Sequence, residues 1–180
     1  KLYPGYRNAW RRVEYKDGLR VVRVKTYMTA NQGKFKRTLD FLSFMCAAYL
    51  IGLFEKRPDV IVSTSPQFFA AVAGWALGIS RRVPFVFELG ALWPASIVAV
   101  GVLRPSFVIR WMERLELFLY KNSAAVVALT KAFKSNLVRR GIDAQKITVV
   151  NNGVDTWRYE PRPRDEELAK VTGLSNKFVI

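Results

Sequence analysis

The chain has 180 residues, of which 51% are hydrophobic and 13% aromatic, which is enough to form the core of one folded domain. Lysine and arginine number 29 against 14 acidic residues, for a formal net charge of +15. This excess predicts an anionic partner, and the candidates are nucleic acid, anionic lipid headgroups and a phosphorylated substrate. The chain has no histidine, which excludes a Ser-His-Asp triad, a Cys-His dyad and the usual zinc sites within it.

Residues 1–15 mix Tyr, Arg and Trp with turn formers and are predicted to be irregular surface polypeptide. Residues 19–27 alternate in polarity and predict a strand. The single cysteine, Cys46, excludes an internal disulfide and is expected to be an inert core thiol. The sequence opens at Lys1 and ends in what resembles the start of a new strand, so we interpret it as a piece of a longer protein.

The longest apolar segment, residues 38–54, predicts a helix. It is at the lower limit of length for spanning a membrane and contains Asp40, which favours a core helix or one lying in the membrane interface. Burial against a sheet is preferred over membrane contact. The basic residues on its flanks are nevertheless candidates for contact with lipid headgroups, and they are Lys34, Lys36, Arg37, Lys56 and Arg57.

The rest of the chain alternates between short apolar runs and helical segments. Strands are predicted at 60–62, 84–89, 124–129 and 147–150, and helices at 68–79, 105–120, 131–140 and 165–171. In the helix at 105–120 the predicted buried stripe comprises Phe107, Val108, Trp111, Met112, Leu115 and Leu119, and it leaves Arg110, Glu113, Arg114 and Glu116 largely outside. The alternation predicts an α/β fold with a Rossmann-like, doubly wound parallel sheet.

The segment at 84–96 carries the main candidate site, because ligands of open parallel sheets bind at the carboxyl ends of the strands. Glu88 stands where the predicted strand ends. Gly90 follows and allows close approach of a ligand, and Trp93 supplies an indole. The alternative is a plain strand end, with Trp93 in the core.

Polar residues after the other predicted strands are further candidates. Ser63 and Ser65 lie in a hydroxyl-rich turn, where Ser65 also fits the N-cap of the next helix with Pro66 at its first position. The same turn could present N–H groups and hydroxyls to a phosphate or sugar. Thr130 is the predicted cap of the helix at 131–140, with Gly141 closing it. The turn at 151–155 is rich in residues that tolerate left-handed geometry.

The sequence resembles the N-terminal domain of family 4 glycosyltransferases with the GT-B fold, closest to the bacterial branch that transfers amino sugars such as N-acetylfucosamine. The motifs that carry the resemblance are Tyr3-Pro4-Gly5-Tyr6-Arg7, Ser65-Pro66, Phe87-Glu88 with Leu92-Trp93-Pro94, Leu129-Thr130 and Asn152-Gly153-Val154-Asp155. It implies an acceptor-side Rossmann-like domain over residues 1–155, with its first strand upstream of Lys1. Residues 156–180 are then a linker, a short helix and the first strand of a C-terminal donor-binding domain.

The resemblance also implies an activity, retaining transfer from a nucleotide sugar to an acceptor linked to polyprenyl diphosphate, in O-antigen, capsule or exopolysaccharide synthesis. Neither a metal nor another cofactor is expected. The donor would bind the C-terminal domain, so this fragment alone is expected to be inactive. Glu88 would be catalytic, and the substrate-binding residues would be Ser63, Ser65, Gly90, Trp93, Thr130, Asn152 and Asp155. The protein is expected to be peripheral on the anionic cytoplasmic face of the inner membrane.

The central motif departs from the branch pattern, which has Arg, Asp and Glu where this sequence has Gly90, Ala91 and Ala95. Either Glu88 is then the only carboxylate of the motif, or catalytic competence is reduced. The departure keeps open a non-catalytic membrane- or partner-binding domain derived from a transferase half. A basic nucleic-acid-binding module is a weaker alternative, because it leaves the strand–helix alternation and the motif at 152–155 unexplained.

Overall fold

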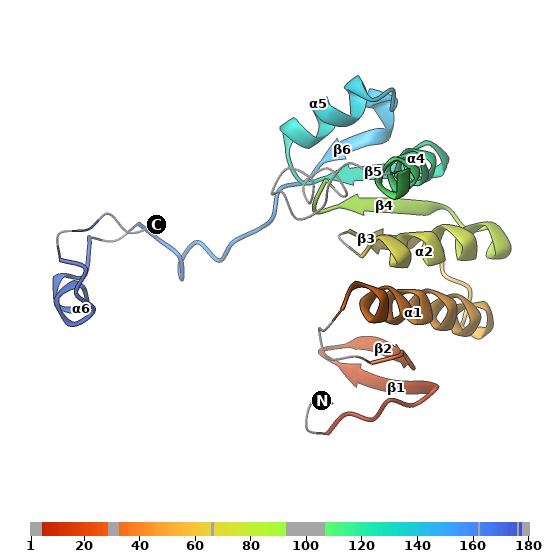
Figure 1. Cartoon of the computed structure of the whole chain (residues 1–180), viewed down its shortest axis with the longest axis horizontal. Coiled ribbons are helices and arrows are strands. Elements are labelled where there is room, and N and C mark those ends of the chain that lie inside the picture. Colours follow the sequence, from red (N-terminus) through yellow and green to blue (C-terminus); the bar gives the residue numbers. More distant parts are fainter. Residues whose placement is uncertain are drawn as a thin grey trace.

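A computed structural model of the chain describes residues 5–28, 33–65, 67–92, 107–161, 163–175 and 177. Its centre is a four-stranded parallel sheet in the order β3-β4-β5-β6 (Figure 1). The strands are β3 (Ile61–Thr64), β4 (Phe85–Leu89), β5 (Ala125–Ala128) and β6 (Ile147–Val149). They alternate with helices α2 (Phe68–Arg81), α4 (Phe107–Asn122) and α5 (Lys131–Arg139), and a short 3₁₀ turn, η1 (Ala144–Lys146), leads into β6. The predicted α/β fold with a parallel sheet is confirmed.

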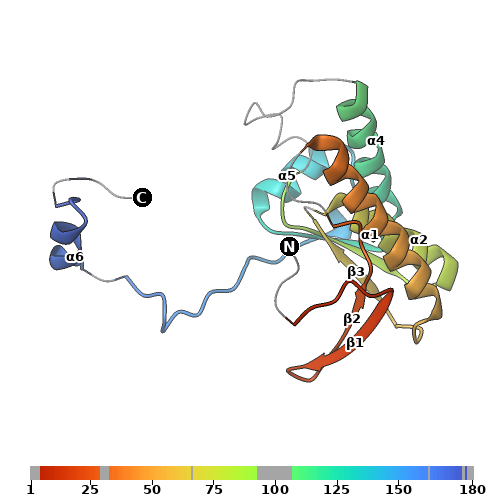
Figure 2. The same ribbon diagram turned by 60° about the horizontal axis from the view of Figure 1, so that its bottom comes forward.

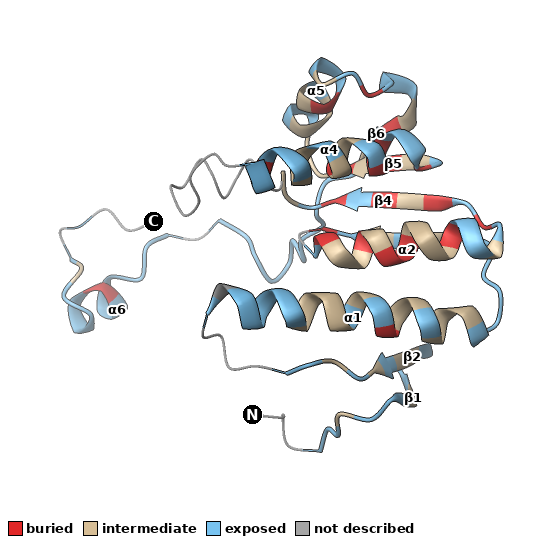
Figure 3. Ribbon diagram, turned by 45° about the vertical axis from the view of Figure 1, so that its right-hand side comes forward, coloured by how far each residue is buried: buried red, intermediate tan, exposed pale blue. Residues whose placement is uncertain are grey.

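The core lies on the face of the sheet that α2 and α4 cover. Phe87 of β4 meets Tyr120 of α4 edge-on, with ring centroids 4.8 Å apart, and both side chains are buried. Burial concentrates on β4 and α2 (Figure 3). Alternate residues point to the opposite face, where Val62 is 57% exposed and Glu88 is also exposed. The two faces of the sheet are therefore covered unequally within the described part of the chain.

An antiparallel hairpin precedes the parallel sheet, formed by β1 (Arg11–Lys16) and β2 (Leu19–Val24). The prediction of a strand after residue 18 is confirmed, whereas the prediction of irregular chain is wrong for β1. The reason is cross-strand pairing, which opposes Glu14 to Val21 and brings its carboxylate to Arg23. Composition does not reveal such pairings, because they depend on which residues of the two strands come to lie opposite each other.

A carboxylate joins the hairpin to the helix that follows it, α1 (Lys34–Phe54). Glu55, just after α1, accepts hydrogen bonds from Arg11 at 2.7 Å and Arg20 at 2.6 Å. These two guanidinium groups lower the pKa of Glu55 below its usual value. The hairpin is therefore held against the end of α1 by two ion pairs.

Helix α1 lies beside α2 and not against the sheet (Figures 1 and 2). Phe41 stacks on Phe69 with ring centroids 6.4 Å apart, and Tyr49 and Ser80 share a hydrogen bond of 2.9 Å. Among the described side chains of α1 only Ala47 is buried, and Cys46 is exposed. The expectations of a sheet-covered helix and of a core thiol are both wrong, because α2 and the hairpin cover only part of the helix surface.

Helix α4 confirms part of the predicted buried stripe, because Leu119 is buried and Met112 and Leu115 pack against the core, but the rest of the prediction is wrong. Phe107, Val108 and Trp111 are 73%, 61% and 52% exposed, respectively, whereas Glu116 is 2% exposed. Hydrophobicity alone placed the stripe, but Glu116 gains two hydrogen-bond partners in the interior, which offset the cost of burying a carboxyl group.

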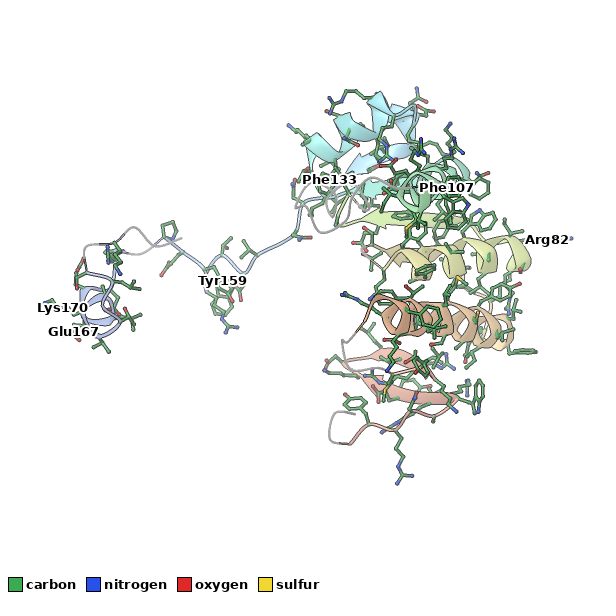
Figure 4. The ribbon with its side chains drawn as sticks, viewed as in Figure 1. Arg82, Phe107, Phe133, Tyr159, Glu167 and Lys170 are labelled. Carbon is green, nitrogen blue, oxygen red and sulfur yellow. The ribbon has the colours of Figure 1, made fainter. Side chains whose placement is uncertain are left out.

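Beyond β6 the chain leaves the sheet as an extended segment that carries helix α6 (Glu166–Val171). Figure 4 shows Tyr159 on this segment, and Glu167 and Lys170 on α6, away from the sheet. Asp165 caps α6 by accepting from the N–H of Leu168 at 2.9 Å. The predicted short charged helix is confirmed.

Candidate functional site

The carboxyl ends of the four parallel strands form one edge of the sheet. The register pairs Thr64 with Glu88, and Leu89 with Ala128, so the residues that follow these strands lie along the same edge. The structure thereby brings Ser65, Glu88, Gly90 and Thr130 to this edge. This is the place where open α/β sheets bind ligands.

Ser65 joins the ends of β3 and β4. Its side chain is buried, and its Oγ accepts hydrogen bonds from the N–H of Gly90 at 2.9 Å and of Ala91 at 3.2 Å. The Ser65 N–H in turn donates to the Glu88 carbonyl at 2.9 Å. The alternative role of Ser65 as a helix N-cap is wrong, because its hydroxyl is used here and the N-cap of α2 is Gln67. Ser65 therefore shapes the edge by fixing the turn after Glu88.

Gly90 is packed tightly against this turn. A Cβ atom at Gly90 would lie 3.0 Å from the backbone carbonyl oxygen of Ser65.

We expect Gly90→Ala to lower the free energy of unfolding by about 1–3 kcal/mol, because the backbone oxygen of Ser65 must move to admit the methyl group. Urea denaturation of the protein measures this effect. Gly153→Ala is the matched control, since a Cβ there meets no atom within 4 Å, and its effect is expected to be within about 0.5 kcal/mol. Equal effects of the two substitutions would contradict the tight packing.

Glu88 presents an exposed carboxylate at this edge, on the opposite face of β4 from the buried Phe87 and Leu89. Its neighbours in the register are Thr64 of β3 and Val127 of β5. An exposed carboxylate can accept hydrogen bonds from sugar hydroxyls, take up a proton, or stabilise developing positive charge. No group of three or more potential metal ligands occurs among the residues that the structure describes.

Thr130 begins helix α5 at the same edge. Its Oγ1 accepts from the N–H of Phe133 at 3.2 Å, and Gly141 after the helix has φ +84°, so the predicted cap and stop are both confirmed. Sequence reasoning did not select Asn151, whose Nδ2 donates to the carbonyl of Leu129 at 2.9 Å and links the ends of β5 and β6. Its position directly after the predicted strand at 147–150 was the feature of the sequence that could have identified it as a residue of this edge.

The remaining candidates lie elsewhere. Ser63 faces α2, where its Oγ packs against Gly74. Asn152 and Asp155 are exposed on the segment leaving β6, and the carbonyl of Asp155 accepts from the N–H of Tyr159 at 2.9 Å. Trp93 lies outside the described residues.

The basic candidates lie at the two ends of α1. Lys36 and Arg37 are exposed in its first turn, and the guanidinium of Arg37 lies 5.5 Å from the ring centroid of Phe41. Lys56 and Arg57 are exposed after its end, and Arg57 donates to the carbonyl of Arg82 at 2.7 Å. The position of the Lys34 side chain is outside the described part of the structure.

Comparisons with solved structures and with protein families relate the chain to known proteins. Solved structures of Anabaena Alr3699/HepE share its fold: the complex with UDP-glucose is 18% identical with a TM-score of 0.55, covering 80% of this chain and 35% of that chain. The complex with UDP and glucose is 19% identical, with a TM-score of 0.55, and the match covers 81% of this chain and 36% of the HepE chain. The chain thus spans about a third of the length of these structures. A search of curated proteins returned no match.

The family comparison covers most of the chain. The family model described as a glycosyl transferase 4-like domain matches residues 2–153, which include β1 to β6 and every candidate at the carboxyl edge of the sheet. This chain therefore belongs to the glycosyl transferase 4-like domain family.

Proposed function

We propose that this chain is the acceptor-side half of a retaining glycosyltransferase that uses a nucleotide-sugar donor. The observation that carries the proposal is the convergence of Glu88 with the Ser65–Gly90 turn at the carboxyl edge of the sheet. Family membership supports it, and so does the fold shared with the HepE structures in complex with UDP-glucose and with UDP. The donor is expected to bind a further domain, since the chain spans about a third of those structures.

The proposed chemistry needs no bound metal, because basic side chains and helix N-termini can stabilise the leaving diphosphate. Glu88 would contact the sugar transferred or the acceptor hydroxyl. The proposed acceptor is a sugar linked to polyprenyl diphosphate, and the proposed donors are amino sugars such as N-acetylfucosamine, in the synthesis of bacterial surface polysaccharide.

The test uses the longer protein that contains this domain. Incubated with candidate nucleotide sugars and a lipid-diphosphate-linked sugar, it is expected to release nucleoside diphosphate and to lengthen the acceptor by one sugar with retained anomeric configuration. The readouts are mass spectrometry of the lipid-linked product and NMR of the new linkage. Failure to bind any nucleotide sugar would favour the alternative of a non-catalytic membrane- or partner-binding domain.

We also propose that α1 holds the protein on the cytoplasmic face of the inner membrane. Helix spacing places six residues on one face of α1, and this α1 stripe comprises Phe35, Leu39, Leu42, Cys46, Leu50 and Leu53. Phe35 and Leu50 are 75% and 54% exposed. By length and composition, residues 35–54 would suffice to cross a membrane. The basic residues at both ends of α1 would add about 1 kcal/mol each on an anionic surface.

Leu50→Glu is expected to weaken binding to phosphatidylglycerol-containing vesicles by at least about tenfold, because it removes an apolar contact and adds a negative charge. Vesicle flotation measures the bound fraction. Val138→Glu on α5, where the side chain is 41% exposed, adds the same charge outside the α1 stripe and is expected to have little effect. Equal loss in the two variants would show that net charge alone governs the association.

A further inference from the structure

A cavity lies at the amino edge of the sheet, at the opposite end of the strands from the site described above. Its volume is about 500 Å³, within the range of small-molecule sites. Val83 and Pro84 lead into β4, Ala124 leads into β5, and Lys146 leads into β6. The lining is completed by Trp75, Gly78, Ile79, Arg82, Phe85, Lys121, Asn122 and Ser123. Because it lies at the other end of the strands, this cavity is separate from Glu88.

The charged residues of this amino-edge cavity are all basic. Arg82, Lys121 and Lys146 line it, and no acidic side chain is among the described residues of the lining. Lys146 is held in place, since its Nζ donates to the carbonyl of Lys121 at 2.6 Å. Guanidinium and ammonium groups that line one cavity can pair with the oxygens of a phosphate group.

The rest of the lining is largely apolar. Trp75 is held by Phe118, whose ring meets it edge-on with centroids 5.0 Å apart. Ile79 is 61% exposed beside it, and Pro84 is exposed on the adjoining loop. A ligand that fills this cavity therefore needs an apolar portion as well as an anionic group.

The backbone at Arg82 gives an independent reason to assign a role to its side chain. Arg82 ends α2 with φ 51° and ψ 51°, a left-handed conformation that glycine usually provides at the ends of helices. An arginine there is strained relative to glycine, because its Cβ crowds the neighbouring backbone. Figure 4 shows its side chain extending from the end of α2, on the far side of the molecule from Tyr159. A strained non-glycine residue that lines a cavity is consistent with a binding function.

We propose that the amino-edge cavity binds an amphiphilic phosphate, a phosphate group attached to an apolar or aromatic carrier. Arg82, Lys121 and Lys146 hold the phosphate, and Trp75, Ile79 and Pro84 contact the carrier. The site does not depend on the proposed transferase activity, because none of its residues lies at the carboxyl edge.

Isothermal titration calorimetry on the intact protein tests the proposal. The probes are phenyl phosphate, short-chain phosphatidic acid below its micellar concentration, and inorganic phosphate. The first or second probe is expected to bind at least about tenfold more tightly than inorganic phosphate, because only it makes the apolar contact. Binding of phosphatidic acid alone identifies a lipid source, and binding of phenyl phosphate alone identifies a soluble one.

Arg82→Gly separates binding from folding. It removes a cationic side chain and relieves the left-handed strain, so the melting temperature should stay the same or rise while the dissociation constant rises at least about tenfold. Lys121→Gln, at an exposed position, should also weaken binding, whereas Arg139→Gln on α5 loses the same charge outside the cavity and should not. The proposal is overturned if neither amphiphile binds, if inorganic phosphate binds as tightly, or if both cavity variants retain the affinity of the unchanged protein.

Discussion

Replacing Glu88 by glutamine in the longer protein is expected to lower kcat by about a hundredfold or more, with a smaller change in KM. Glutamine keeps the size and one acceptor oxygen but loses the negative charge and the ability to take up a proton, which together are worth about two to four orders of magnitude in rate. Glu88 is exposed, so the substitution should leave folding intact. Single-turnover measurements with a saturating donor separate the chemical step from binding.

Two further variants serve as a control for the loss of charge and as a test of the neighbouring position 91. Glu167→Gln on α6 removes the same charge away from the sheet (Figure 4) and should leave kcat unchanged. Ala91→Asp restores the carboxylate that the resembling branch carries next to Gly90. Unchanged turnover in Ala91→Asp would show that position 91 is not catalytic, and unchanged turnover in Glu88→Gln would remove Glu88 from the mechanism.

Replacing Glu116 by leucine is expected to lower the free energy of unfolding by about 3 kcal/mol. Glu116 is 2% exposed, and its carboxyl oxygens accept from the Tyr120 hydroxyl and the Arg140 guanidinium, each at 2.8 Å. Leucine leaves the buried hydroxyl of Tyr120 without an acceptor and Arg140 without its partner. Urea denaturation measures the loss, and Glu113→Leu on the same helix, at a partly exposed position, is the control.

A double-mutant cycle isolates the cause. If the unpaired hydroxyl of Tyr120 carries much of the cost, the double variant Glu116→Leu/Tyr120→Phe should lose at least about 1 kcal/mol less than the sum of the two single variants. Strict additivity would show that the two side chains do not interact energetically.

The stability that Glu116 contributes to the folded protein is expected to change with pH in one direction. Burial, the largest cause, raises the pKa of Glu116 above its ordinary value of 4.5, so the folded protein holds that proton more tightly than the unfolded chain does. The stabilisation is complete below the unfolded pKa and decreases as pH rises through the folded pKa. The stability difference between the unchanged protein and Glu116→Leu should therefore narrow above about pH 4.5. A difference that widens with pH would indicate that attraction to Arg140 outweighs burial.

Local sequence signals predicted the elements that depend on neighbouring residues. The strand–helix alternation, the cap at Thr130 and the left-handed Gly141 each follow from contacts or backbone preferences within a few positions. The order of elements was sufficient to predict the parallel sheet, and hence that Glu88 and Thr130 would share an edge.

Tertiary structure decided which side chains remain available at that edge and which surfaces remain open. Ser65 shares a hydrogen bond with Gly90, 25 positions away, and Glu116 shares one with Arg140, 24 positions away. Whether a hydroxyl caps a helix, or a carboxylate enters the core, depends on such distant partners, because their hydrogen bonds offset the cost of burial. The exposure of α1 has the same origin: its sequence determined a long apolar helix, but only the packing of α2 and the hairpin decided how much of it is covered.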